Sequence, residues 1–195
     1  TMDTTEVLRA VLDAELQRVA VFGFYDPDAV DQITAAGVGA TVTVELGGKL
    51  PMPALTQRSQ PLTVNSEVKP ISSGKFEAKV AMARGLTMNM GTSAVLSVGP
   101  VDIAIISRHI EPYDPECFRS LGVEPTAYDY VMLKSRIHYR VGFRNMAKQV
   151  VECAGRGVCT SDYSQLTFEK VRRPVYPLDQ DGGGANESWS LPFAE

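Results

Sequence analysis

Residues 129–144 read Asp129-Tyr-Val-Met-Leu-Lys-Ser-Arg-Ile-His-Tyr-Arg-Val-Gly-Phe-Arg144, and this stretch decides the predicted fold. It begins as a buried strand at residues 130–133 and changes character at Lys134. Polar side chains follow at once, before a predicted helix over residues 139–151. In open α/β sheets, ligands gather at the carboxyl ends of strands, beside the amino ends of the next helices. The stretch therefore predicts one unit of an α/β sheet and also the place of its site.

The segments before residue 62 predict the beginning of that sheet. Residues 4–16 carry the apolar stripe of an amphipathic helix, with Asp3 and Glu6 as a capping arrangement. Residues 18–24 form an apolar run typical of a strand covered on both faces. Asp26 and Pro27 then start a helix that ends at Gly37. The alternating, β-branched residues 40–46 predict a second strand, so the unit is expected to be a right-handed βαβ crossover.

The middle of the chain predicts antiparallel strands. Residues 62–69 and 75–82 read as a hairpin, and residues 88–98 and 101–107 as two strands joined at Gly99-Pro100. Asp114 starts a helix that ends near Leu121, a short helix is expected at residues 161–166, and prolines favour an extended conformation at residues 170–178. The predicted fold is α/β, a mixed sheet flanked by helices with an antiparallel hairpin excursion. We expect one domain over residues 1–179 and a C-terminal arm or linker over residues 180–195.

Composition narrows the functional class. The chain has 195 residues, a formal net charge of −4 and 44% hydrophobic residues, which are ordinary globular values. A net negative charge gives no indication of binding to nucleic acid or to anionic lipid. No apolar run approaches the roughly 18 residues of a membrane span. No secretory signal is visible, and three cysteines are too few for a disulfide framework. We therefore expect a cytoplasmic protein, with Cys117 buried and Cys153 and Cys159 as unpaired thiols.

The candidate site is the polar group after the strand at residues 130–133. His138 is the candidate catalytic residue, because an imidazole can act as acid or base or donate to an oxyanion. Arg140 can clamp a carboxylate, and Lys134 and Ser135 complete the candidate substrate-binding residues. Ser135 is not expected to be a nucleophile, since no Gly-x-Ser-x-Gly elbow surrounds it. The plain structural alternative is a histidine that is merely hydrogen-bonded where a helix begins.

Other constellations are weaker. A metal site could be drawn from His109, Glu111 and Asp114, but one histidine with carboxylates falls short of the usual zinc ligands, and Asp114 is committed to capping. Gly47-Gly48 lacks the ending of a phosphate loop and reads as a turn. The acidic tail from Asp179 lacks the pattern of a calcium loop. No metal site is therefore expected in this chain.

Several segments together resemble the carboxyl-terminal domain of the MlrC-like metallopeptidases, a family named after a microcystin-degrading enzyme. The order and spacing of the matches, which extend to Asp179, make the resemblance specific. The matching segments are residues 3–12, Tyr25-Asp-Pro-Asp-Ala-Val30, Ala36-Gly-Val-Gly-Ala40, Leu46-Gly-Gly-Lys49, Met90-Gly-Thr-Ser-Ala-Val-Leu96, Ser107-Arg108, Pro112-Tyr-Asp-Pro115, Lys134-Ser-Arg-Ile-His-Tyr-Arg140 with Phe143, and Arg172-Arg-Pro-Val-Tyr-Pro-Leu-Asp179.

The resemblance implies a two-domain zinc peptidase or amidohydrolase whose amino-terminal domain supplies the zinc ligands. This chain would then be a domain that is inactive alone. Lys134, Ser135, His138 and Arg140 would line the cleft between the domains and face a peptide or small amide substrate. Two alternatives stay open: a structural or dimerising module, in which a homo-oligomer forms, and a module that binds a small anion.

Overall fold

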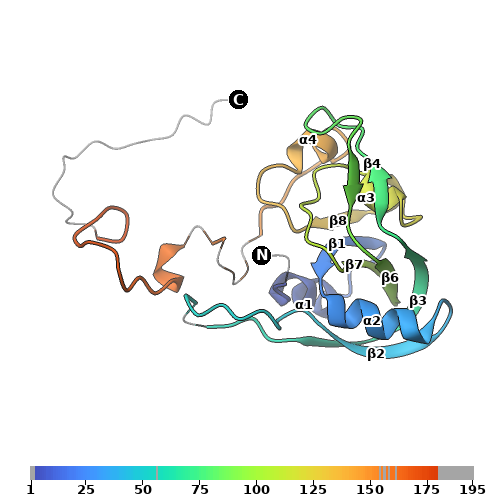
Figure 1. The fold of residues 1–195 in the computed structure, drawn as a ribbon, viewed down its shortest axis with the longest axis horizontal. Helices are drawn as coiled ribbons and strands as arrows, with labels where there is room; N and C mark the ends of the chain where they lie inside the picture. The colour runs from blue at the N-terminus through green and yellow to red at the C-terminus, as the bar shows by residue number, and fades with distance from the viewer. Residues whose placement is uncertain are drawn as a thin grey trace.

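A six-stranded mixed sheet forms the centre of the molecule (Figure 1). The computed structural model describes residues 3–55, 57–153, 155, 157, 159–160 and 162–179, so the arm expected over residues 180–195 lies outside the described residues. The sheet has the order β2-β3-β6-β7-β1-β8. Its strands are β1 (Val19–Tyr25), β2 (Thr41–Leu46), β3 (Leu62–Ser72), β6 (Ser93–Val98), β7 (Val101–Ile106) and β8 (Tyr130–Leu133).

Two short strands and the helices complete the described fold. The strands β4 (Lys75–Glu77) and β5 (Thr87–Asn89) pair with each other as a separate antiparallel hairpin. The α-helices are α1 (Glu6–Asp13), α2 (Pro27–Ala36), α3 (Glu116–Arg119) and α4 (Arg140–Phe143), and the 3-10 helices are η1 (Pro125–Ala127) and η2 (Tyr163–Gln165). The predicted class is confirmed: the sheet is mixed, helices flank it, and an antiparallel hairpin leaves it between residues 62 and 107.

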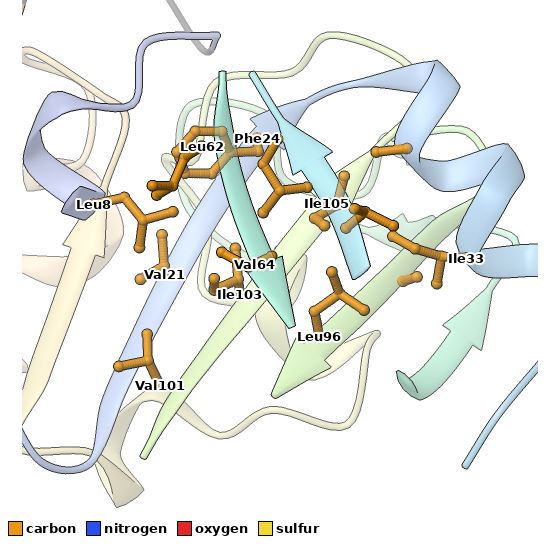
Figure 2. Close-up of a cluster of buried hydrophobic side chains, with 14 of the residues drawn as sticks. Leu8, Val21, Phe24, Ile33, Leu62, Val64, Leu96, Val101, Ile103 and Ile105 are labelled. Atoms are coloured by element: carbon orange, nitrogen blue, oxygen red, sulfur yellow. The ribbon is translucent and has the colours of Figure 1, made fainter. Parts of the chain in front are cut away.

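The alternation of side chains along β1 divides the core into two layers. Val19 and Val21 pack in one cluster with α1 and α2, whereas Ala20 and Phe22 pack in the other with α3 and α4. The pairing register with β7 shifts between Phe22 and Phe24, which returns the Phe24 ring to the first cluster. Figure 2 shows this first cluster, in which strands and α2 contribute aliphatic side chains around Phe24. Helices on both faces are therefore a direct consequence of a β1 strand that is apolar on both faces.

The predicted βαβ crossover is wrong. β1 is parallel to its two neighbours, β7 and β8, while the antiparallel pairings from β7 through β6 and β3 to β2 make β2 run opposite to β1. The helix α2, capped by Asp26 as predicted, therefore packs beside β2 without joining two parallel neighbours. The predicted hairpin of residues 62–69 with 75–82 is also wrong, because β3 pairs with β2 and β6.

The β2–β3 ribbon explains why this prediction failed. β3 pairs with β6 only from Glu67 to Ser72, and its first half pairs with β2 alone. That half crosses the first core cluster, to which Leu62 and Val64 belong together with Phe24 (Figure 2). An eleven-residue strand with alternating burial can satisfy two different neighbours along its length, and local pattern does not reveal which.

Three local predictions needed correction. Residues 130–133 form β8, an edge strand in which Tyr130 is 51% exposed, not a buried central strand. The helix expected over residues 139–151 is only α4, since Phe143 is its single buried residue. The cap of α1 is Thr5, and Asp3 instead accepts backbone hydrogen bonds from Lys49 and Leu50.

Candidate functional site

The parallel strands β7, β1 and β8 end at one edge of the sheet. Their registers place Tyr25 beside Ile106, and Leu133 beside Phe22. The segments that leave this edge are Ser107 to Glu111 after β7, Asp26 after β1, and Lys134 to His138 after β8. Chain segments that are far apart in the sequence thus deliver polar side chains to a common edge, as expected for an open α/β sheet.

Glu111 is the centre of the polar group at this edge. Its Oε2 lies 2.7 Å from Nδ1 of His138, and its Oε1 accepts a hydrogen bond of 2.5 Å from the Ser135 hydroxyl. Partial burial raises the pKa of Glu111, but the hydrogen bonds from Ser135 and His138 outweigh it and hold the pKa below its ordinary value. The carboxyl group is therefore ionised at neutral pH and can only accept hydrogen bonds.

An ionised Glu111 fixes the tautomer of His138. Because the carboxylate accepts, Nδ1 must carry the proton, and in the neutral ring Nε2 is the nitrogen with the free lone pair. The imidazole side chain is 53% exposed, and Nε2 makes no hydrogen bond within the described part of the chain. The ring is thus held at Nδ1, while its side chain is about half exposed.

Ser135 supports this arrangement. Its hydroxyl donates to Glu111 and also accepts from the backbone N–H of Tyr139 at 3.1 Å. These two bonds close the turn of residues 135–139 and tie it to the loop after β7. The proton of the Ser135 hydroxyl is directed at Glu111, and the expectation that Ser135 is not a nucleophile stays a prediction.

The Lys134 side chain does not join the group around Glu111 and instead contacts Thr4 and Phe24. Its ammonium group donates to the carbonyl oxygen of Thr4 and to the Thr4 hydroxyl, and it lies 4.3 Å from the centre of the Phe24 ring. Burial lowers the pKa of Lys134 to about 8, although the carboxylates of Glu6 and Asp3 act in the opposite direction. Lys134 and Ser135, adjacent in sequence, therefore belong to two separate polar groups.

Arg140 lies apart from both groups. Its guanidinium stands over the Tyr139 ring at 5.2 Å and forms an ion pair of 2.8 Å with Glu152. Both side chains of that pair are largely exposed, so the pair is weak and Arg140 can exchange Glu152 for another carboxylate. Of the four predicted residues, the structure brings together only Ser135 and His138.

A further polar network joins the end of β1 to the turn after β2. Asp26 is buried, and it accepts from the N–H groups of Ala29 and Gly47 and from the ammonium of Lys49 at 2.8 Å. Gly48 donates its N–H to the carbonyl oxygen of Asp3. The segment Leu46-Gly-Gly-Lys49 is thus a turn, as predicted. Carboxylates hold this turn, and Asp26 neutralises the charge of Lys49.

The described residues do not fit a zinc site. Over residues 3–179, apart from the gaps noted above, no group of three or more His, Cys, Asp or Glu side chains is arranged to hold a metal. His109 is exposed and meets Tyr25 edge to face, and Asp114 accepts from the N–H groups of Lys79, Val80 and Glu116. The thiols of Cys153 and Cys159 are free and exposed, and Cys117 is buried. No helix in the described part of the chain is long and apolar enough to cross a bilayer.

Glu111 is the residue that sequence reasoning misplaced. It was considered as a metal ligand beside His109, whereas its side chain binds His138, 27 residues away. The sequence feature that indicates a role for Glu111 is its position in the loop after the very apolar strand β7. This feature becomes useful only when β7 and β8 are known to flank β1 in parallel, which local patterns did not reveal.

Comparisons with known proteins give one consistent answer. The family described as MlrC C-terminus matches residues 1–170. Microcystinase C of Sphingomonas sp. is 29% identical over 178 residues, which cover 91% of this chain and 32% of that protein. The crystal structure of a candidate metallopeptidase from Mesorhizobium sp. BNC1 has a TM-score of 0.80 and 25% sequence identity, and covers 91% of this chain and 34% of its own. The chain therefore spans about a third of the length of these relatives.

Proposed function

The chain belongs to the MlrC C-terminus family, and we propose that it is the part of a zinc-dependent peptidase or amidohydrolase that completes the substrate cleft. The metal would be bound by the amino-terminal region that such relatives carry outside the matched third. The similarity to a candidate metallopeptidase supports hydrolysis as the reaction class. Since the described residues here do not fit a zinc site, no step of the mechanism proposed for this chain passes through the metal.

The observation that carries the proposal is the pair formed by Glu111 and His138. The carboxylate holds Nδ1–H of the imidazole and leaves Nε2 without a hydrogen-bond partner among the described residues, on a side chain that is half exposed at the carboxyl edge of the sheet. Nε2 can accept a proton from the water that attacks the amide carbon, and the resulting imidazolium is stabilised by the ionised Glu111. The imidazolium can then return this proton to the amine that leaves as the C–N bond breaks. In this proposal His138 is the catalytic residue, and Glu111 is a positioning residue.

The other predicted residues take roles that fit their contacts. Arg140 is the proposed substrate-binding residue, because an exposed guanidinium can bind a substrate carboxylate in bidentate fashion. Ser135 and Lys134 were predicted to contact substrate, and that contact stays a prediction. Their hydrogen bonds favour a structural role for both side chains. Ser135 binds Glu111, and Lys134 binds the segment before α1.

The test is a pair of substitutions in the full-length protein, assayed with peptide and small amide substrates. We expect His138→Ala to lower kcat by roughly 10²–10⁴-fold, and Glu111→Gln to lower it by roughly 10–100-fold, as for residues that orient a functional histidine. The zinc content, measured by elemental analysis, should stay unchanged in both. Glu77→Gln is the matched control, because Glu77 is an exposed carboxylate on β4.

Unchanged turnover in His138→Ala would remove the catalytic assignment. A fall in melting temperature with kcat per folded molecule preserved would instead favour the structural alternative, in which the polar edge only docks onto its partner region. A loss of zinc would show that His138 acts through the metal site.

A further inference from the structure

Exposed apolar side chains concentrate in the last described part of the chain. Half of the large apolar residues that are exposed in the described structure lie between residues 150 and 176, in a segment that supplies no member of either core cluster. They are Val150, Val151, Tyr163, Phe168, Val171, Val175 and Tyr176. Figure 1 shows this segment, in orange and red, extending away from the sheet and helices. Exposed apolar side chains that gather in one segment point to an interaction surface.

The segment ends in a loop with a defined shape, residues 173–179, which we call the Tyr176 loop. Arg173 and Asp179 form an ion pair that closes the loop, with Nε of Arg173 donating to Oδ2 of Asp179 at 2.6 Å. The N–H of Val175 donates to the same carboxylate at 2.7 Å, and the N–H of Asp179 donates to the carbonyl oxygen of Val175 at 2.9 Å. The predicted extended conformation is therefore bent into a closed turn.

Tyr176 lies within this closed loop and is 80% exposed, the highest value among the exposed large apolar residues. A tyrosine buries a large area at low cost in side-chain entropy and is enriched among residues that dominate binding energy. A loop that is already closed by hydrogen bonds also loses less conformational entropy on binding. The two features together describe an anchor residue that is presented before its partner arrives.

Among the described residues, side chains of the site edge reach the start of the segment: Arg136 donates to the carbonyl oxygen of Cys159, and Arg140 pairs with Glu152. Leu166 forms an isolated bridge with Leu55, and Thr167 donates its N–H to the carbonyl oxygen of Ala54 at 2.7 Å. These contacts hold the middle of the segment beside the loop of residues 50–61, while the Tyr176 loop itself makes its described polar contacts only internally.

We propose that the Tyr176 loop docks onto the amino-terminal region of the same protein, with Tyr176 inserted into an apolar pocket there. The choice of partner follows from length: about two thirds of the relatives lies outside the part matched by this chain. Glu169, Lys170 and Arg172 are exposed beside the loop and carry one net positive charge, so the pocket is expected to have at least one acidic side chain at its rim. This inference rests on the proposed function, which supplies such a region.

The experiment is photo-crosslinking in the full-length protein. A benzophenone amino acid replaces Tyr176, and in a control protein it replaces Val38, which is 68% exposed. Val38 belongs to the turn between α2 and β2, and this turn lies on the side of the molecule away from the Tyr176 loop (Figure 1). We expect irradiation to join position 176 to a peptide from outside residues 1–195 of the same molecule, at monomer mass. Position 38 should give no such product.

Two results would overturn the inference. A crosslink from position 176 to residues 1–195 of a second copy, at dimer mass, would assign the loop to self-association. Equal yields at positions 176 and 38, or none at either, would show a loop without a docking partner. As a second measure, Tyr176→Ser should lower the melting temperature of the full-length protein by a few degrees, and Val38→Ser should not.

The failure of this inference is separable from that of the proposed function. If position 176 joins the amino-terminal region but that region binds no zinc, docking stands and the proposed peptidase fails. If zinc is bound and turnover depends on His138 while position 176 gives no crosslink, only the docking inference fails.

Discussion

The ammonium group of Lys134 is largely buried, and folding therefore removes water from a charged group. Burial lowers the pKa of its ammonium group from 10.5 to about 8, so between these values the unfolded chain binds the proton more tightly than the folded one. The contribution of Lys134 to the free energy of unfolding is therefore smallest below pH 8 and increases as the pH rises toward 10.5.

We expect this increase to show as a difference between the parent chain and Lys134→Met. The free energy of unfolding of the parent, relative to the variant, should rise by about 1–2 kcal/mol between pH 8 and 10. Urea unfolding at several pH values measures it. Lys75→Met, at an exposed lysine on β4, is the control and should give a flat difference. A flat difference for Lys134→Met as well would mean that its ammonium stays hydrated.

At the residue level, the sequence indicated the polar residues of the candidate site, but it did not indicate the partners that their side chains bind. The concentration of Lys134, Ser135 and His138 after β8 was visible from residue types alone. Their partners were not, because Glu111 and Thr4 come from segments 24 and 130 residues away. Which of two adjacent polar residues meets which partner depends on the direction each side chain leaves the end of the strand.

At the element level, local sequence features predicted the ends of several strands and of one helix. The strands expected at residues 18–24 and 101–107 and the helix between Asp26 and Gly37 follow from apolar runs, caps and a proline, whereas the run expected at residues 88–98 is divided between β5 and β6. The length of α4 was overestimated, because its residues after Phe143 have no core to cover. The partners of β3 were missed since pairing is a long-range choice that alternation does not encode.

The turn after β2 offers a test of how tightly the elements are fitted. Gly47 has φ +57°, and a Cβ there would lie 2.2 Å from the carbonyl oxygen of Asp3; Gly99 has the same φ of +57° with nothing within 4 Å. We expect Gly99→Ala to cost about 1 kcal/mol of stability, for the positive φ alone. Gly47→Ala should cost roughly 3 kcal/mol or more, since backbone must also move.

Denaturant unfolding of the two glycine variants at one pH separates these contributions. The excess cost of Gly47→Ala measures the contact between the turn after β2 and the segment before α1. Equal costs for the two substitutions would mean that Asp3 moves away freely, and that Lys134 and Lys49 do not hold this segment in place.

At the scale of the whole molecule, the sheet and the exposed segment are separate in their packing. Every buried member of the two core clusters lies at or before Phe143, and the last partly buried contributor is Met146. The predicted single domain over residues 1–179 remains untested. Packing indicates that residues beyond about 148 contribute little to the stability of the sheet and serve a purpose other than covering it.

This separation predicts that a chain ending at Lys148 still folds. We expect its thermal unfolding, followed by circular dichroism, to stay cooperative, with a midpoint within about 5 °C of the full 195-residue chain. The modest loss would come from exposing Leu55, which is now 7% exposed beside Leu166, and from removing the Arg140–Glu152 ion pair, which is weak in water. Leu55→Ser in the longer chain is the control and should reproduce most of that loss. A truncated chain that unfolds without a cooperative transition would show that the segment is part of the folding unit, and that its exposed apolar residues contribute to stability within this chain.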